Sequence, residues 1–284
     1  MARDPTFRGT AIRAQFEALA DAISEEVTVY LIGGGALTLT DLKPATKDID
    51  LVVRSPTVLK HLHESLLAAG YREEVELGEE YEELSAAFIV QNDRGHRFDV
   101  FNQQVAGVLR LTDGMVERSE PVLEAGPLHV RRVSHEDIFL FKSVANRRDD
   151  VSDMEVLAAT GLDFDIIESE MYAQIELLSD DAFLGAIVGK LEKLEEQGVT
   201  IPAFGQTVQA LQQRATTASD VFAHVRTKYE MEYAADDLYE GVPVKRVVQT
   251  LEMEEETVLA ALEWLEQLGE LRRAGDCVVP VRDE

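Results

Sequence analysis

The chain has 284 residues, 45% of them hydrophobic, so it is long enough for two domains and apolar enough for a buried core. No apolar run reaches the length of a membrane span, no secretory signal follows the first methionine, and the single cysteine, Cys277, excludes an internal disulfide and a cysteine-rich zinc site. We therefore expect a cytoplasmic protein that makes no contact with a membrane.

The net charge of -27, from 54 acidic and 27 basic residues, is extreme. Adaptation to molar salt explains such a surface, because a short Debye length screens charge repulsion that would destabilise the fold in dilute buffer. We therefore expect a halophilic cytoplasm. The alternative is a surface that repels phosphate backbones. Molar salt screens that repulsion as well, so the charge does not exclude an RNA partner.

The first 160 residues predict helices and strands in alternation. Runs of β-branched and apolar residues indicate strands, while Ser55-Pro56 is a typical helix start and Gly70 a typical stop. The expected elements are a helix at 10–23, a strand at 27–32, a helix at 36–42, a strand at 48–53, a helix at 55–70, a hairpin of strands at 86–91 and 96–101, and a strand at 128–133. This succession predicts an α+β domain with a small mixed β-sheet flanked by helices.

The second half predicts mainly helices, beginning after Ser134, whose hydroxyl could cap the first of them. Near the end, helices at 244–251 and 256–268 precede a hairpin at 271–281, and this succession resembles a winged helix-turn-helix. We expect an α+β domain at 1–160, a helical region at 161–230 and a winged-helix-like domain at 231–284.

DNA binding by the C-terminal segment is not expected. Its recognition helix would present only acidic charge near the DNA, and glutamates repel phosphate. The glutamates concerned are Glu254, Glu255, Glu256, Glu263 and Glu266. Dimerisation or docking of a partner protein is the favoured role for this segment.

Three aspartates stand in otherwise apolar strands. Asp48 and Asp50 would point to the same face of one strand, about 6 to 7 Å apart, where they repel each other unless a divalent cation lies between them. Asp99 stands between Phe98 and Val100, and its charge also needs a partner, which a shared metal would supply. Carboxylate oxygens suit Mg²⁺ or Mn²⁺. The alternative is that Asp48 merely begins a strand and Asp99 faces solvent on an edge.

Gly33, Gly34 and Gly35 end the first strand. Glycine permits positive φ and lets backbone amides approach phosphate oxygens, and the helix that follows would present its positive end to the same anion. Three glycines alone are also typical of a simple chain reversal.

The order of these features along the chain is similar to that of a known protein superfamily. An apolar strand, Gly33-Gly34-Gly35, twelve residues, Asp48-Ile49-Asp50 and a later Phe98-Asp99-Val100 resemble the nucleotidyltransferase superfamily with the DNA polymerase β-like fold. The resemblance implies that Gly33, Gly34 and Gly35 bind the substrate and that the Gly34 and Gly35 amides hold the β and γ phosphates of a nucleoside triphosphate. It also implies that Asp48 and Asp50 bind two metal ions, and that Asp99 completes the second metal site or accepts the proton of the attacking hydroxyl.

A second resemblance concerns the segment from Lys142 through Arg147 and Asp150 to Asp153. It is similar to AbiEii-like toxin nucleotidyltransferases and related uncharacterised archaeal proteins, over about residues 26 to 160. The resemblance implies that Lys142 and Arg147 lie at the substrate and that Asp150 lies in the active site. The alternative is that these four side chains pair with one another on a helix surface. The chain departs from the family pattern at Gly34-Gly35, where Gly-Ser is usual.

The sequence therefore predicts a Mg²⁺- or Mn²⁺-dependent enzyme that transfers a nucleoside monophosphate to an RNA, such as a tRNA, to a protein or to a small-molecule hydroxyl. The second resemblance adds the toxin of a toxin–antitoxin pair as a role, with a homodimer or a cognate antitoxin as partner. Two alternatives stay open: a catalytically silent scaffold that only binds a nucleotide, and a winged-helix regulatory protein.

Overall fold

The computed structural model describes residues 6–74, 85–145, 147, 149–178, 182–199, 201–233, 240–251, 253–267 and 269–281. The chain forms two compact units, Met1–Phe204 and Gly205–Glu284. The domain boundaries expected at residues 160 and 230 stay predictions.

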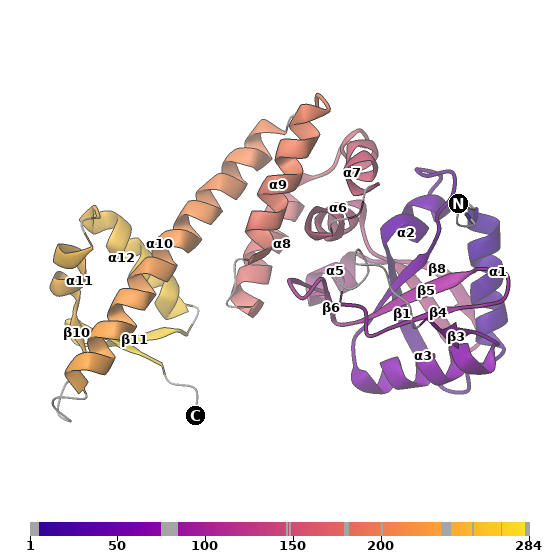
Figure 1. The fold of residues 1–284 in the computed structure, drawn as a ribbon, viewed down its shortest axis with the longest axis horizontal. Helices are drawn as coiled ribbons and strands as arrows, with labels where there is room; N and C mark the ends of the chain where they lie inside the picture. The colour runs from indigo at the N-terminus through magenta and orange to yellow at the C-terminus, as the bar shows by residue number, and fades with distance from the viewer. Residues whose placement is uncertain are drawn as a thin grey trace. The chain divides into compact units, whose positions relative to one another are not determined.

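A seven-stranded mixed sheet forms the centre of the first unit, with the strand order β3-β4-β5-β2-β1-β9-β8 (Figure 1). Strand β2 pairs in parallel with β5 and antiparallel with β1, and β1 pairs in parallel with β9. The strands are β1 (Val27–Ile32), β2 (Ile49–Val53), β3 (Arg72–Glu73), β4 (Phe88–Gln91), β5 (Arg97–Asn102), β8 (Glu120–Ala125) and β9 (Leu128–Arg132). The predicted α+β class with a mixed sheet is confirmed.

Helices α1 (Gly9–Ala20) and α3 (Pro56–Ala68) pack against this sheet. The Ser55 hydroxyl accepts a hydrogen bond from the Val58 amide at 3.2 Å, so α3 begins where its capping sequence predicts. The ring of Phe98 on β5 lies 5.8 Å from that of Phe16 on α1 and 5.2 Å from that of Tyr71. Because side chains alternate along a strand, burying Phe98 in this core turns Asp99 to the opposite face.

Two element boundaries differ from the prediction near the glycines. Helix α2 (Gly33–Leu39) begins at the first glycine and not after the third, so the glycines form its first turn. Strand β2 begins at Ile49, and Asp48 stands just before it.

Several short elements between β5 and β9 were not predicted. They are the two-stranded pair β6 (Gln104–Val105) and β7 (Leu109–Arg110), helix α5 (Asp113–Arg118) and strand β8. Strand β8 contains Pro121 and lies at the edge of the sheet, where a residue without an N–H is tolerated. Its pairing with β9 is irregular at that residue.

The helices that follow the sheet contact one another. They are α6 (His135–Val144), α7 (Asp150–Ala158), α8 (Phe164–Leu178) and α9 (Ala182–Glu196), and α6 contacts the other three. The Ser134 hydroxyl accepts a hydrogen bond from the Asp137 amide at 3.2 Å, as its capping position predicts. This arrangement brings Lys142 on α6 next to the start of α7.

The second unit contains all but the first three residues of α10 (Pro202–Tyr233). Its other elements are β10 (Val242–Pro243), α11 (Val244–Thr250), α12 (Glu255–Gln267), β11 (Leu271–Ala274) and β12 (Cys277–Pro280). Its three strands form a sheet in the order β10-β12-β11. The predicted helix pair and hairpin are present, while their assignment to the winged-helix class stays a prediction. Trp264 is buried, and the Arg214 guanidinium lies 4.6 Å from its ring centroid.

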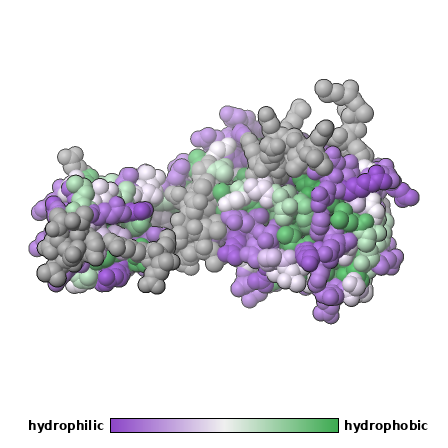
Figure 2. Space-filling view, turned by 60° about the horizontal axis from the view of Figure 1, so that its bottom comes forward, coloured by the Kyte–Doolittle hydropathy of each residue, from purple (hydrophilic) through white to green (hydrophobic). Residues whose placement is uncertain are grey.

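The surface reflects the composition. Figure 2 shows hydrophilic residues over much of the face in view, with hydrophobic residues in smaller areas between them. Among the described helices, none combines the length and the apolarity that crossing a membrane requires.

Candidate functional site

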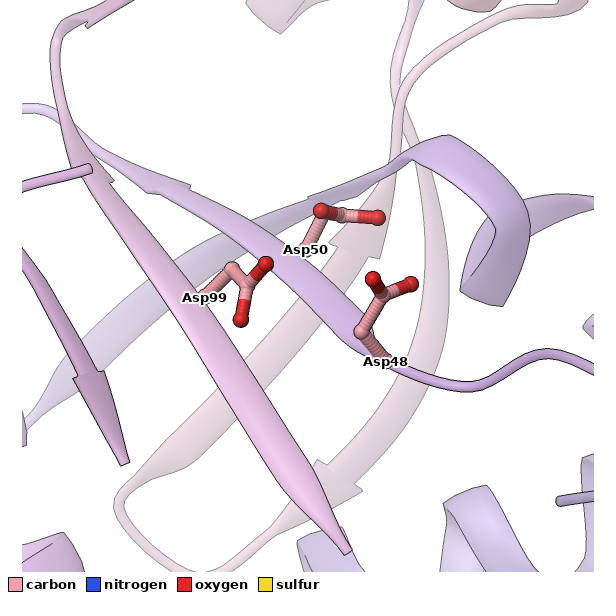
Figure 3. Close-up of side chains that lie close together, drawn as sticks. All are labelled: Asp48, Asp50 and Asp99. Carbon is pink, nitrogen blue, oxygen red and sulfur yellow. The ribbon is translucent and has the colours of Figure 1, made fainter. Parts of the chain in front are cut away.

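The three predicted carboxylates converge. Asp50 on β2 and Asp99 on β5 are direct neighbours in the register of the parallel pair, and Asp48 precedes Asp50 by two residues on the same face. One carboxylate oxygen from each residue lies within 4.8 Å of the others, and all three residues are buried (Figure 3). The alternative of an Asp99 exposed on an edge is wrong, because β5 lies between β4 and β2 and Asp99 is 0% exposed.

Two arginines contact this triad of carboxylates. The Arg147 guanidinium lies 2.9 Å from Asp50, 3.5 Å from Asp99 and 3.4 Å from Asp48. Arg97 donates two hydrogen bonds to Asp99, at 2.6 and 2.9 Å. Arg97 was not among the predicted site residues, although its position two residues before Asp99 places both side chains on one face of β5.

Burial raises the pKa of Asp99 to about 7, and the charges of Asp48 and Asp50 add to the rise. Burial also raises the pKa of Asp50, against the attraction of Arg147. The two hydrogen bonds from Arg97 lower the pKa of Asp99 but do not outweigh its burial among carboxylates. Arg97 and Arg147 therefore neutralise the negative charge of the triad only in part. The triad is suited to additional positive charge.

The residues fit a divalent cation. Among the described residues, Asp50 Oδ2 is buried and has no hydrogen-bond partner. A Cβ atom on Gly33 would lie 2.2 Å from that oxygen, and Gly33 has a φ of +64°, so a glycine is needed there on both counts. A buried carboxylate oxygen without a donor is costly, and a hard cation would satisfy it.

A cavity of about 400 Å³ opens beside the triad. Asp48 lines it, together with four basic side chains, Lys43, Lys47, Lys142 and Arg147. This volume lies within the range of small-molecule sites. Asp149, Asp150 and Asp153 line it as well, so its charges are mixed, and the basic side chains offer contacts for an anion. The sequence did not single out Lys43 or Lys47.

A smaller cavity of about 20 Å³ adjoins the first. Asp50 and Gly33 line it, and Arg147, Lys142 and Asp150 line both cavities. Arg147 therefore lies between the space next to Asp48 and the space next to Asp50.

The predicted glycines take different positions. Gly34 lines the larger cavity, and a Cβ there would lie 2.6 Å from the Thr46 hydroxyl. Gly35 lines neither of these two cavities and lies near Leu31 and Ile49 instead. The expected contacts of the glycine amides with phosphate stay a prediction.

Lys142 stands at the centre of a buried ion-pair network. Its Nζ lies 2.8 Å from Asp150 and 2.7 Å from Asp153. Lys43 reaches Asp153 at 2.9 Å, and the Arg147 amide donates to Asp150 at 2.7 Å. Lys142, Asp150 and Asp153 are 5%, 1% and 6% exposed. The alternative expected these side chains to pair on a helix surface, and it is wrong because the three residues are buried.

The opposite charges of this network keep one another ionised. Burial lowers the pKa of Lys142, but the two aspartates outweigh it and hold that pKa above its ordinary value. Burial alone would raise the pKa of Asp150. The charge of Lys142 outweighs this effect and holds that pKa below its ordinary value. Both side chains therefore stay charged near neutral pH.

Comparison with known families decides the assignment. A family model described as a nucleotidyltransferase of unknown function (DUF6036) matches residues 10–182, more than half of the 284-residue chain. The chain belongs to this nucleotidyltransferase family. The match includes the triad and the Lys142 network, and it ends within the first unit. A search of curated proteins found no match.

Membership of the DUF6036 nucleotidyltransferases confirms the broader of the two resemblances. The narrower one, to AbiEii-like toxins, stays a prediction. Nucleotidyltransferases generally use divalent metals, and the convergence of Asp48, Asp50 and Asp99 agrees with that requirement. The identity of the metal and the roles of single residues are matters of proposal.

Burial of Asp99 predicts a pH dependence of stability for this nucleotidyltransferase when metal is removed with a chelator. Its pKa in the folded state, about 7, lies above the ordinary value of 3.8, so folding favours the protonated form. Stability from this group is fully present below pH 3.8 and is lost as the pH rises through 7. From pH 5 to 8 we expect the wild type to lose about 2 kcal/mol relative to Asp99→Asn.

Urea unfolding of both proteins at pH 5 and pH 8, followed by far-UV circular dichroism, measures this difference. Because the remaining titratable groups are common to both proteins, the comparison reports Asp99 together with its electrostatic effect on Asp48 and Asp50. Parallel pH profiles would show that Asp99 ionises in the folded protein as it does in the unfolded chain.

Proposed function

We propose that this protein is a Mg²⁺-dependent nucleotidyltransferase that transfers a nucleoside monophosphate from a triphosphate to a hydroxyl group, with release of pyrophosphate. One observation carries the proposal. Three buried carboxylates, two on adjacent strands and one just before a strand, converge beside a cavity whose lining includes four basic side chains. Mn²⁺ would serve the same oxygen ligands.

The roles follow from position. Asp48, Asp50 and Asp99 would hold metal ions, which when bound would polarise the α-phosphate and favour ionisation of the attacking hydroxyl. Lys142 and Arg147 would contact the phosphates from the wall of the larger cavity, and Lys43 would join them. Asp150 would act indirectly, because it holds the Lys142 ammonium and the Arg147 amide in place.

Gly33 and Gly34 would let the phosphates approach the backbone at the start of α2. The acceptor follows the prediction from sequence: an RNA such as a tRNA, a protein or a small molecule. The toxin role, with a homodimer or a cognate antitoxin as partner, rests on the narrower resemblance alone. A cytoplasmic, halophilic setting remains part of the proposal on grounds of composition.

A catalytically silent scaffold is the second candidate. The observation that favours it is the Arg147 guanidinium, which contacts all three carboxylates at the place where cations would bind. A DNA-binding regulator has less support, because Glu255, Glu256 and Glu263 lie exposed on α12.

One assay separates these candidates. The full-length protein is incubated in high salt with each of four labelled nucleoside triphosphates and Mg²⁺, with and without total RNA. We expect label in RNA, or in the protein itself, that disappears when a chelator removes the metal. Binding of triphosphate by calorimetry without any transfer of label would instead support the silent scaffold.

A further inference from the structure

Arg147 occupies the position that a metal ion would take. Its guanidinium lies within 3.5 Å of an oxygen of Asp48, Asp50 and Asp99. Only 17% of the Arg147 side chain is exposed. A guanidinium and a metal ion cannot share this space, so the triad accepts a cation only after the Arg147 side chain has moved.

The same side chain divides the site. Asp48 lines the larger cavity and Asp50 the smaller one, while Arg147, Lys142 and Asp150 line both. Of these three, Arg147 is the one whose guanidinium contacts Asp48, Asp50 and Asp99. With the guanidinium withdrawn, Asp50 would face the same space as Asp48. The triad would then be open to a ligand in the larger cavity.

Only the side chain of Arg147 has to move, and its backbone can stay in place. The Arg147 amide donates a hydrogen bond of 2.7 Å to Asp150, and Asp150 also accepts one of 2.8 Å from Lys142. These bonds fix the backbone at position 147 beside the larger cavity. The long side chain can then turn from the triad into that cavity by rotation about its own bonds.

Charge decides when this rotation is favourable. In the triad the guanidinium faces three carboxylates. The larger cavity also contains aspartates, but Asp150 and Asp153 already pair there with Lys142 and Lys43. Moving the guanidinium into that cavity exchanges three carboxylates for aspartates that have partners, which is unfavourable unless an anion enters as well. A polyphosphate would supply that negative charge and receive the guanidinium.

We propose that Arg147 blocks metal binding in the nucleotide-free protein and releases the triad when a polyphosphate enters the larger cavity, so that metal and nucleotide bind cooperatively. The inference rests on the proposed function and concerns the regulation of the same site. By linkage, each ligand strengthens the binding of the other. A free metal ion alone must displace Arg147 without compensation and therefore binds weakly.

Titration of the nucleotide-free protein with Mn²⁺ alone, followed by calorimetry, tests the proposal. We expect Arg147→Met to bind Mn²⁺ on the order of tenfold more tightly than the wild type. Arg147→Lys keeps the positive charge and should stay near the wild type. Lys43→Met serves as the matched control, because it removes a positive charge from the same cavity without vacating the triad.

Arg147→Gln replaces Arg147→Met if the latter does not fold, as judged by circular dichroism. Equal Mn²⁺ affinity in the wild type and the neutral variants would overturn the inference and leave the proposed function standing. Equal gains in Arg147→Met and Lys43→Met would also overturn it, since a general charge effect would then explain both. No Mn²⁺ binding by any of these proteins would overturn the inference and the proposed metal role together.

Discussion

Replacement of Asp50 by Asn is expected to lower nucleotidyl transfer by about 1,000-fold, because it removes the central negative charge of the triad while keeping the shape of the side chain. Asp50 lies between its neighbour Asp99 on β5 and Asp48 along the chain, and its Oδ2 is the buried oxygen best placed for a cation. A neutral amide would hold a divalent ion much less tightly. Initial rates of Mg²⁺-dependent label transfer measure the effect.

The control for this variant is Asp93→Asn. Asp93 lies in the turn between β4 and β5 and forms an exposed ion pair with Arg72 at 3.2 Å. This variant makes the same chemical change in an exposed turn of the same sheet, outside the triad, and should transfer label at the wild-type rate. Transfer by Asp50→Asn within tenfold of the wild type would contradict the assignment of Asp50 as a metal ligand.

Replacement of Lys142 by Met is expected to destabilise the first unit by about 3 kcal/mol or more, because it leaves buried carboxylates without their main counter-charge. Asp150 would keep the Arg147 amide and Lys190, whose Nζ lies at 3.8 Å, and Asp153 would keep Lys43. These remaining partners limit the loss of stability. They do not replace the two ion pairs of Lys142, which are both shorter than 3 Å.

Urea unfolding followed by far-UV circular dichroism is the measurement for Lys142→Met. Fluorescence of the single tryptophan would be unsuitable, because Trp264 belongs to the second unit and Lys142 to the first. Lys60→Met is the matched control, since Lys60 forms an exposed pair with Glu64 at 3.9 Å and should cost less than about 0.5 kcal/mol. Equal losses in the two variants would show that the buried network does not stabilise the fold.

The position of the triad could be predicted because it depends on local rules. Alternation along a strand places Asp48 and Asp50 on one face, and an apolar setting around Asp99 indicates a buried strand. Local rules cannot predict that β2 pairs with β5, and this pairing places Asp50 opposite Asp99. The family resemblance supplied that step.

The partners of the triad could not be predicted in the same way. Arg147 stands 97 residues from Asp50 in the chain, and tertiary packing brings them together. Lys43 lies 110 residues from its partner Asp153. The family resemblance implied substrate contact for Arg147, and the alternative was pairing on a helix surface. In the structure its guanidinium contacts the triad, and substrate contact stays a prediction.

Short elements were missed for a related reason. Strand β8 contains a proline and lacks a clear alternation of apolar and polar residues, so its structure depends on β9. Helix α2 begins at Gly33 although glycine is a poor helix former, because the chain must leave β1 beside Asp50. Tertiary contacts override local preference at both places.

The register between β2 and β5 has a consequence for how the family can vary. In this register Ile49 faces Phe98 while Asp50 faces Asp99. Gain or loss of one codon inside either strand would exchange the two faces and so remove both the packing and the chemistry. Length differences among homologous genes should therefore be confined to the segments that connect the strands.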